Sequence, residues 1–205
     1  MVPVPVSRND TVEPDPIREK SPEKQVCWYS FWHILMLDNP IRRFLQDPEK
    51  ILKGYIRPGM TVIDIGCGPG DFTRTMRKMA GQDGQVIAID LQQEMLRHAQ
   101  EKCSGVKGGA PVTWHQCRPD SLGITAQADF ALSFYMVHEV PDAERLFCEV
   151  FQSLTSGGRY LIVEPVFHVE ESAFAGMLEA VQRAGFIVRE QPPLRLSRAV
   201  LLEKP

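Results

Sequence analysis

The chain has 205 residues, which is enough for one sizeable α/β domain with a short additional segment. Its 23 Lys and Arg and 26 Asp and Glu residues give a net charge of −3 and are scattered, so nothing indicates binding to a nucleic-acid backbone. The 5 cysteines are an odd number without C-x-x-C spacing, which argues against a disulfide framework and a zinc site, and we expect no metal.

The N-terminal region divides into two predicted segments. Residues 1–24 are rich in proline and charge and poor in large apolar groups, which predicts a mobile tail. Residues 25–44 contain "CWYSFWHILML", which predicts an aromatic helical arm with Trp28 and Trp32 on one face. Three roles are open for it: packing on the domain, a lid over an apolar acceptor, or an interfacial helix.

No stretch of the chain looks like an export signal or a membrane span. The N-terminus lacks the charged-then-apolar pattern of a signal peptide, and the longest apolar stretch is shorter than the ~20 residues that cross a bilayer. We therefore predict a cytoplasmic protein without a transmembrane segment. An oligomer is possible, but the sequence does not indicate one.

From residue 47 onward, helical segments and apolar runs can be placed in order. Asp47 and Pro48 predict a helix through about Tyr55, and a later helical stripe is predicted to end at Gly157-Gly158. Strands are predicted at 61–65, 86–90, 112–115, 128–134, 159–163, 185–189 and 197–202. The alternation predicts a parallel sheet with helices on both faces, but the short Pro-Pro connection before the last run predicts an antiparallel last strand.

A glycine loop follows the first predicted strand in "VIDIGCGPG". Gly66, Gly68 and Gly70 stand where the strand turns into a helix, and bare backbone there lets a ligand approach closely. The second strand ends in Asp90, a carboxylate placed to accept hydrogen bonds from ribose hydroxyls, to cap the next helix, or both. Asp71 replaces the last glycine of the dinucleotide pattern and would repel a pyrophosphate, so a cofactor with an ammonium and a sulfonium fits better.

Four segments in order resemble the motifs of class I S-adenosylmethionine-dependent methyltransferases. They are "VIDIGCGPG", "VIAIDLQQEM", "ADFALSFYMVHEVPD" and "LTSGGRYLIVEP", and they are most similar to the small-molecule branch that includes the ubiquinone/menaquinone-biosynthesis methyltransferases. The resemblance implies one Rossmann-like domain over residues 45–205. That domain has a seven-stranded, mostly parallel sheet with an antiparallel last strand. The implied cofactor is S-adenosyl-L-methionine, and the implied product is S-adenosyl-L-homocysteine.

The resemblance also implies cofactor contacts, position by position. The methionine part is surrounded by Asp64, Gly66, Gly68 and Gly70, while Asp90 holds the ribose and Leu91 lies against the adenine. The remaining implied cofactor contacts are Cys67, Ser133, Cys117 and Arg118.

The chain departs from the family after the third strand, where an acid usually accepts the adenine amino group. Cys117 and Arg118 stand there instead, and Asp120 follows two residues later. Either Asp120 takes the place of that acid, or main-chain groups near Cys117 contact the adenine.

Catalytic groups are expected at the ends of the fourth and fifth strands. His138 is the preferred base because it follows the fourth strand and titrates near neutral pH, and Tyr135 is predicted to line the methyl channel. Glu139, Glu164 and His168 are further candidates. An imidazole just before a helix also often only satisfies backbone groups, and Glu164 is equally suited to bonding a loop.

The predicted activity is in-line methyl transfer to a small, apolar or aromatic acceptor. Nucleic-acid methyltransferases are disfavoured because "FYMV" replaces the Asn/Asp-Pro-Pro-aromatic tetrad and no Pro-Cys nucleophile is present. A thiol-based metalloid methyltransferase would need Cys27, Cys67 and Cys117 to converge. Two other classes stay open: a catalytically silent cofactor-binding module, and an NAD-dependent oxidoreductase that shares the strand, loop and acid pattern.

Overall fold

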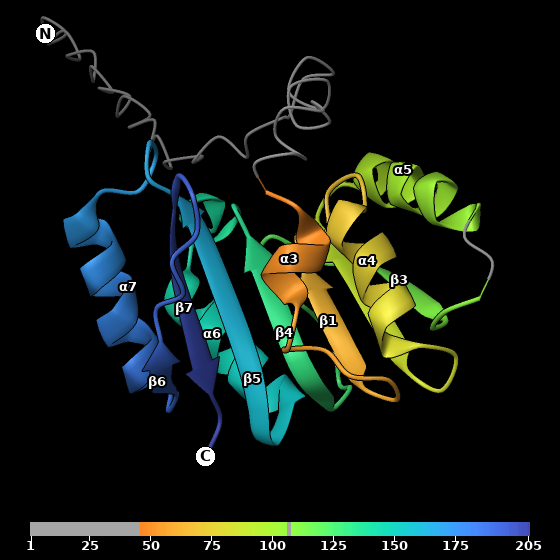
Figure 1. The fold of residues 1–205 in the computed structure, drawn as a ribbon. Coiled ribbons are helices and arrows are strands. Elements are labelled where there is room, and N and C mark those ends of the chain that lie inside the picture. The colour runs from red at the N-terminus through yellow and green to blue at the C-terminus, as the bar shows by residue number, and fades with distance from the viewer. Residues whose placement is uncertain (1–45, 106–107) are drawn as a thin grey trace, which may run out of the picture.

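The computed structural model describes residues 46–105 and 108–205, which form an α/β sandwich around one sheet (Figure 1). The predicted tail (1–24) and aromatic arm (25–44) lie outside the described residues. The strands are β1 (Thr61–Ile65), β2 (Gln85–Asp90), β3 (Val112–Gln116), β4 (Ala128–Phe134), β5 (Leu154–Pro165), β6 (Ile187–Glu190) and β7 (Ser197–Glu203). The helices are α3 (Pro48–Leu52), α4 (Asp71–Ala80), α5 (Gln93–Ser104), η1 (Val137–Glu139), α6 (Ala143–Ser153) and α7 (Glu171–Arg183).

The seven strands pair in the order β3-β2-β1-β4-β5-β7-β6. The pairs β1–β2, β2–β3, β1–β4 and β4–β5 are parallel, whereas β7 runs antiparallel to both β5 and β6. The predicted mostly parallel sheet with an antiparallel last strand is therefore confirmed.

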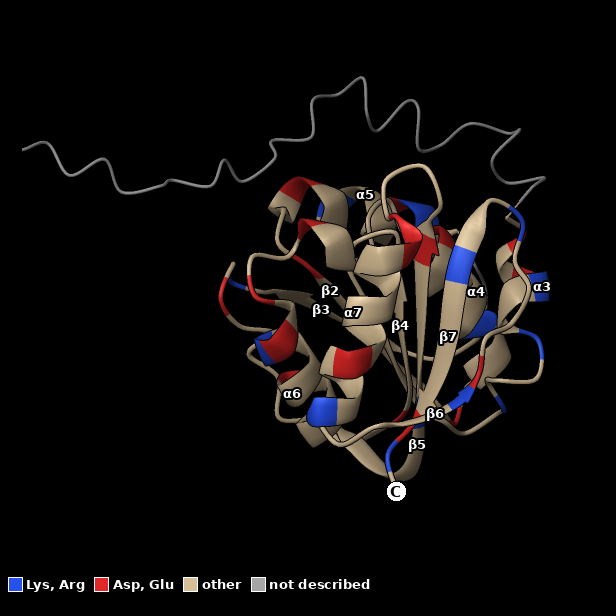
Figure 2. Cartoon of the chain, turned by 90° about the vertical axis from the view of Figure 1, so that its left-hand side faces the viewer, with Lys and Arg blue, Asp and Glu red and all other residues tan. Residues whose placement is uncertain are grey.

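Helices cover both faces of the sheet because its strands are apolar on both sides. Figure 2 shows the sheet edge-on, with α6 and α7 on one face and α3 and α4 on the other. On the first face, Phe147 of α6 and Val181 of α7 share a buried cluster with Ile63 and Ile87 of the sheet. On the second face, Met76 of α4 packs in another buried cluster with strand residues of the opposite parity. This double burial explains why the strands lack the polar alternation of a half-exposed sheet.

The charged residues visible in Figure 2 are of both signs and interspersed over α6, α7 and the loops. No continuous stripe of Lys and Arg runs over the described elements in that view, in line with the scattered charges of the sequence. In residues 46–105 and 108–205, none of the helices has the length and apolar character needed to cross a bilayer.

Two predicted helix ends differ from the structure. Asp47 caps α3 as predicted, accepting a hydrogen bond from the Glu49 N–H at 3.0 Å, but the helix ends at Leu52. The helix α6 ends at Ser153, before Gly157-Gly158, because the chain enters β5 directly at Leu154. Gly157, with φ of 76°, lies where the β4–β5 register shifts, so its left-handed conformation serves an irregularity of the strand rather than a helix end.

The sheet order places one site at the switch point. The chain leaves β1 toward β2 on one side, and β4 returns to pair with β1 on the other side. In open α/β sheets, the crevice outside the carboxyl ends of the strands at this point is where ligands bind. The loops after β1, β2 and β4 should therefore carry the functional residues.

Candidate active site

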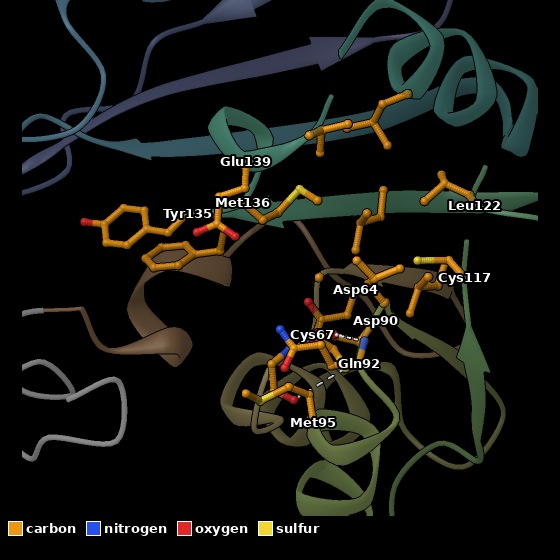
Figure 3. A pocket seen from close by; sticks show the side chains of 18 of the residues that line it. Asp64, Cys67, Asp90, Gln92, Met95, Cys117, Leu122, Tyr135, Met136 and Glu139 are labelled. Carbon is orange, nitrogen blue, oxygen red and sulfur yellow. Dashed lines mark hydrogen bonds between the residues drawn. The ribbon is translucent and has the colours of Figure 1, made fainter. Parts of the chain in front are cut away.

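A cavity of about 600 Å³ lies at this switch point (Figure 3). Its lining comes from the glycine loop after β1, the residues after β2 and β3, and the segment from the end of β4 to the start of α6. The volume is within the roughly 300–1,000 Å³ that is typical of small-ligand sites. The structure thus brings residues of separate sequence motifs into one crevice, as the predicted parallel order of the strands requires.

The three glycines of the loop have different surroundings. A Cβ on Gly68 would meet no atom within 4 Å, and a Cβ on Gly66 would lie 2.9 Å from Cγ of Met136. A Cβ on Gly70 would lie 2.7 Å from Cβ of Ala99 in α5. Position 70 therefore requires glycine because the start of α4 packs closely on α5 there, and Gly70 does not line the cavity. Gly68 borders open space.

Asp90 holds the end of β2 to the glycine loop. Its Oδ2 accepts the Gly68 N–H at 2.9 Å, and its Oδ1 accepts the Gln92 N–H at 2.9 Å beside the start of α5. Burial raises the pKa of the Asp90 carboxyl, and the hydrogen bonds from these two N–H groups oppose the rise. Since an ionised carboxylate offers about four acceptor sites, the two backbone bonds leave capacity for ligand hydroxyls.

Asp64 is buried in β1 at the floor of the cavity. Its Oδ2 accepts a hydrogen bond from the Thr73 hydroxyl at 2.5 Å. Burial, with added repulsion from Asp90 and Asp71, raises the pKa of Asp64 to about 7 against the opposing effect of the Thr73 bond. A charged carboxylate is therefore costly here, and a cation placed beside it would be favourable.

Asp71 opens α4 and also lines the cavity. Lys102 of α5 lies 3.1 Å from its Oδ1, and both side chains are partly buried. We predicted that the negative charge of Asp71 repels a pyrophosphate, and this ion pair offsets part of that charge.

The far end of the cavity carries the departure from the family motif. The Cys117 N–H donates to the Asp90 carbonyl at 3.0 Å, and the Arg118 N–H donates to the Ser121 carbonyl at 3.0 Å. Both main-chain donors are therefore engaged within the fold. Arg118 Nε lies 3.7 Å from Asp120 Oδ1 at the exposed rim, and burial raises the pKa of the Cys117 thiol to about 11. Leu91 lines the same end of the cavity.

Tyr135 closes the opposite end in a conformation that is rare for a non-glycine residue. Its φ is 59°, and its hydroxyl lies 2.6 Å from the Ser197 hydroxyl and also accepts a hydrogen bond from Gln46. Its ring stacks on Phe134 with centroids 4.3 Å apart, and Phe134 in turn packs on Phe72. In Figure 3 the ring points away from Asp64 and Asp90, so Tyr135 contributes to an aromatic wall while its hydroxyl is used within the fold.

His138 lies in η1 and lines the cavity. Its Nδ1 is 2.5 Å from Oε2 of Glu164, a carboxylate of β5 that is buried behind it. Glu139, also in η1, lines the cavity beside His138, and His168 packs against the His138 ring with centroids 5.6 Å apart. The structure therefore gathers His138, Glu139, Glu164 and His168 from the ends of the fourth and fifth strands.

The structure does not bring Ser133 to the cavity. Its side chain is fully buried in β4, and its hydroxyl lies 2.7 Å from the Tyr160 hydroxyl of β5. Its side chain is used within the sheet packing, and a cofactor contact of Ser133 stays a prediction. The other predicted cofactor residues, apart from Gly70, line the crevice.

Sequence reasoning did not single out Met136 and Phe72 as site residues, although both line the cavity. Phe72 lies in the first turn of α4, and its ring packs on Phe134 at the wall of the cavity, with centroids 4.4 Å apart. The available signal was its place in the first turn of the helix that begins at the glycine loop.

Comparison with known proteins now adds family information to this geometry. The profile of a family described as "Methyltransferase domain" matches residues 62–158. A carboxy-S-adenosyl-L-methionine synthase of Hydrogenovibrio crunogenus is 26% identical over 157 residues, which is 73% of this chain and 62% of that protein. The ubiquinone/menaquinone biosynthesis C-methyltransferase UbiE of Pasteurella multocida is 29% identical over 110 residues, 53% of this chain and 41% of that protein. The chain thus spans less than two thirds of the length of these relatives.

A solved structure is similar over almost its full length. A SAM-dependent methyltransferase from Aquifex aeolicus has 27% sequence identity and a TM-score of 0.73, covering 83% of this chain and 96% of that chain. Together with the sheet order and the crevice, these matches show that the chain is similar in sequence and fold to S-adenosylmethionine-dependent methyltransferases.

Proposed function

We propose that this chain transfers a methyl group from S-adenosylmethionine to a small, apolar or aromatic acceptor. The observation that supports this most is the bond between Asp90 and the Gly68 N–H, which sets a carboxylate beside bare backbone at the carboxyl ends of β1 and β2. A nucleoside with a charged amino-acid tail needs this combination: an acceptor for its ribose hydroxyls and close access to a loop for its tail.

The described residues fit the cofactor along the whole crevice. Asp90 retains acceptor capacity for the ribose, and Asp64 and Asp71 provide negative charge for the ammonium and sulfonium groups. Apolar side chains line the end where an adenine would lie, namely those of Leu91, Met95, Cys117 and Leu122. We assign the methionine part to Gly66, Cys67 and Gly68.

The acceptor would lie at the aromatic end of the cavity, against Phe72, Phe134 and Tyr135. When bound, the cofactor supplies an electrophilic methyl group, so the protein's main task is to hold the acceptor in line and exclude water. We assign His138 as the base for an acceptor that carries a proton. Tyr135 is assigned to the wall of the methyl channel, through its ring.

Calorimetry with S-adenosylhomocysteine tests the cofactor site, and transfer of labelled methyl groups to a panel of small phenols, thiols and amines tests the activity. We expect measurable binding and transfer to at least one apolar or aromatic acceptor. Folded protein that gives no heat at millimolar ligand would refute the cofactor assignment.

A catalytically silent cofactor-binding module is the second candidate. The engaged hydroxyl of Tyr135 and the engaged N–H groups of Cys117 and Arg118 favour it, because they leave fewer free polar groups along the crevice. Binding without transfer to any acceptor of the panel would support this candidate. Binding of NADH without binding of S-adenosylmethionine would instead support an oxidoreductase.

A further inference from the structure

A buried carboxylate stands behind the histidine that lines the cavity. Glu164 is only 1% exposed, yet both of its oxygens have partners in the segment after β4. Its Oε1 accepts the Val137 N–H at 2.9 Å, and its Oε2 lies 2.5 Å from Nδ1 of His138. The bond to Val137 fixes the rotation of the carboxylate, so that its second oxygen is aimed at the imidazole.

This arrangement decides which imidazole nitrogen holds the proton. A carboxylate only accepts hydrogen bonds, so the short contact requires the proton on Nδ1 of His138. Nε2 then keeps its lone pair in the neutral ring. Since His138 lines the cavity and Nδ1 faces the buried Glu164, Nε2 is the nitrogen available on the cavity side.

A second carboxyl group faces that nitrogen. Oε1 of Glu139 lies 3.7 Å from Nε2 of His138, and Figure 3 shows the Glu139 side chain between those of Tyr135 and Met136. Burial and the nearby Glu164 charge raise the pKa of Glu139 to about 7, so this group exchanges protons near neutral pH. The groups that face His138 are thus Glu164 from β5, Glu139 from η1 and His168 from the loop after β5.

We propose that Glu164 is a positioning residue: it holds His138 so that Nε2 can accept a proton from the acceptor. Glu139 is the neighbouring group that shares this proton with Nε2. The acceptor class follows: a molecule that must lose a proton, such as a phenol or an acidified C–H group, rather than a tertiary amine or a thioether. This inference rests on the proposed methyltransferase function and names its substrate class.

The proton and electron balance is simple. The acceptor's proton ends on Nε2 of His138, and the pair that held it forms the bond to the methyl carbon. The pair of the broken carbon–sulfur bond stays on sulfur, which becomes neutral. A base at this position is worth roughly 10²- to 10⁴-fold in rate.

The first test replaces Glu164 by Gln and measures the tautomer of His138. In Glu164→Gln the amide oxygen can keep the Val137 N–H bond, and its NH₂ group then donates to Nδ1, which forces the proton to Nε2. An equivalent amide replacement in the serine-protease triad preserves geometry but costs roughly 10⁴-fold in kcat because the tautomer is wrong.

The readout is the ¹⁵N chemical shift of both imidazole nitrogens at pH 8, with His138→Gln used to assign the signals. We expect the Nδ1–H form in the wild type and the Nε2–H form in Glu164→Gln. Glu139→Gln should keep the Nδ1–H form because Glu164 is intact, and His98→Gln, on the surface of α5, serves as the neutral control. An Nε2–H form in the wild type, or an unchanged tautomer in Glu164→Gln, would overturn the positioning role.

The second test compares acceptor classes with labelled S-adenosylmethionine. Transfer to phenols or 1,3-diketones that falls at least 100-fold in Glu164→Gln, with S-adenosylhomocysteine affinity within twofold of wild type, is the expected result. Comparable transfer to a tertiary amine or thioether, unchanged in Glu164→Gln, would overturn the acceptor class. No transfer to any probe by protein that binds S-adenosylhomocysteine would instead refute the proposed activity, while the tautomer would still decide the role of Glu164.

Discussion

The carboxylate of Asp90 and the main-chain N–H of Gly68 are joined by a hydrogen bond of 2.9 Å that ties the end of β2 to the loop after β1. The same carboxylate accepts the N–H of Gln92. One side chain therefore shapes the crevice and also, in our proposal, binds the ligand within it.

Removal of the Asp90 carboxylate should weaken ligand binding strongly. We expect Asp90→Ala to reduce S-adenosylhomocysteine affinity at least tenfold, about 1.4 kcal/mol, because it removes both the ribose acceptor and the loop tether. Isothermal calorimetry measures this change, and Asp83→Asn, an exposed acid in the turn before β2, is the control. Unchanged affinity in Asp90→Ala would remove Asp90 from the site.

The glycines at 68 and 70 should separate binding from folding. Gly70→Ala combines a left-handed φ of 87° with a Cβ placed 2.7 Å from Ala99, so we expect it to lower the free energy of unfolding by about 2–4 kcal/mol. Gly68→Ala, with φ of 51° and open space around its Cβ, should cost about 1–2 kcal/mol.

The affinity for the ligand should fall more in Gly68→Ala than in Gly70→Ala, which is the opposite of the order expected for stability. The added methyl group of Gly68→Ala enters the crevice, so its S-adenosylhomocysteine affinity should fall at least tenfold relative to wild type. Urea unfolding and calorimetry on the same samples check both effects. A Gly68→Ala protein that binds normally would show that the loop backbone does not contact the ligand.

Asp64 should make stability depend on pH. Its folded-state pKa of about 7 lies above the usual value of 3.8, so the folded protein holds a proton that the unfolded chain has released between these values. Its contribution to stability is therefore complete below about pH 4 and is lost as the pH rises to about 7, by at most about 1.4 kcal/mol per pH unit.

Asp64→Asn removes this dependence while keeping an oxygen for the Thr73 hydroxyl. The difference in free energy of unfolding between Asp64→Asn and wild type should grow from pH 4 to pH 7 in favour of the variant and then stay constant. Urea unfolding at a series of pH values measures it. A difference that is flat across this range would contradict a raised pKa of Asp64.

Ser133 should matter for stability and not for the ligand. In Ser133→Ala the buried Tyr160 hydroxyl loses its partner, which should cost about 1–3 kcal/mol, while S-adenosylhomocysteine affinity stays within twofold. The double variant Ser133→Ala/Tyr160→Phe removes both partners and should recover most of the loss. A large fall in affinity without loss of stability would instead support Ser133 as a cofactor contact.

The strands were predictable because their signal is local. Runs of β-branched and apolar residues predicted all seven strands, and the short Pro-Pro connection predicted the direction of β7, which the structure confirms. The predicted end of α6 was wrong because two adjacent glycines, such as Gly157-Gly158, can mark either a helix end or an irregularity in a strand.

The position of Gly66, Gly68 and Asp90 at the crevice was predictable for a related reason. Gly66, Gly68 and Asp90 follow strand ends, and parallel strands bring their carboxyl ends to one edge of the sheet. The packing role of Gly70 was not visible in the sequence, because it depends on the approach of Ala99 from a helix that begins more than twenty residues later.

The sequence by itself determined the order of strands and helices, the parallel character of the sheet and the place of the ligand crevice, since each follows from short-range periodicity and from where glycine and acid stand in the chain. Only the tertiary structure decided which side chains face the crevice. It turned Ser133 toward Tyr160 and brought the buried Glu164 against His138 from 26 residues away. The physical reason is that the pairing register of β4 with β5 sets those contacts, and a register is a property of two segments together rather than of either alone.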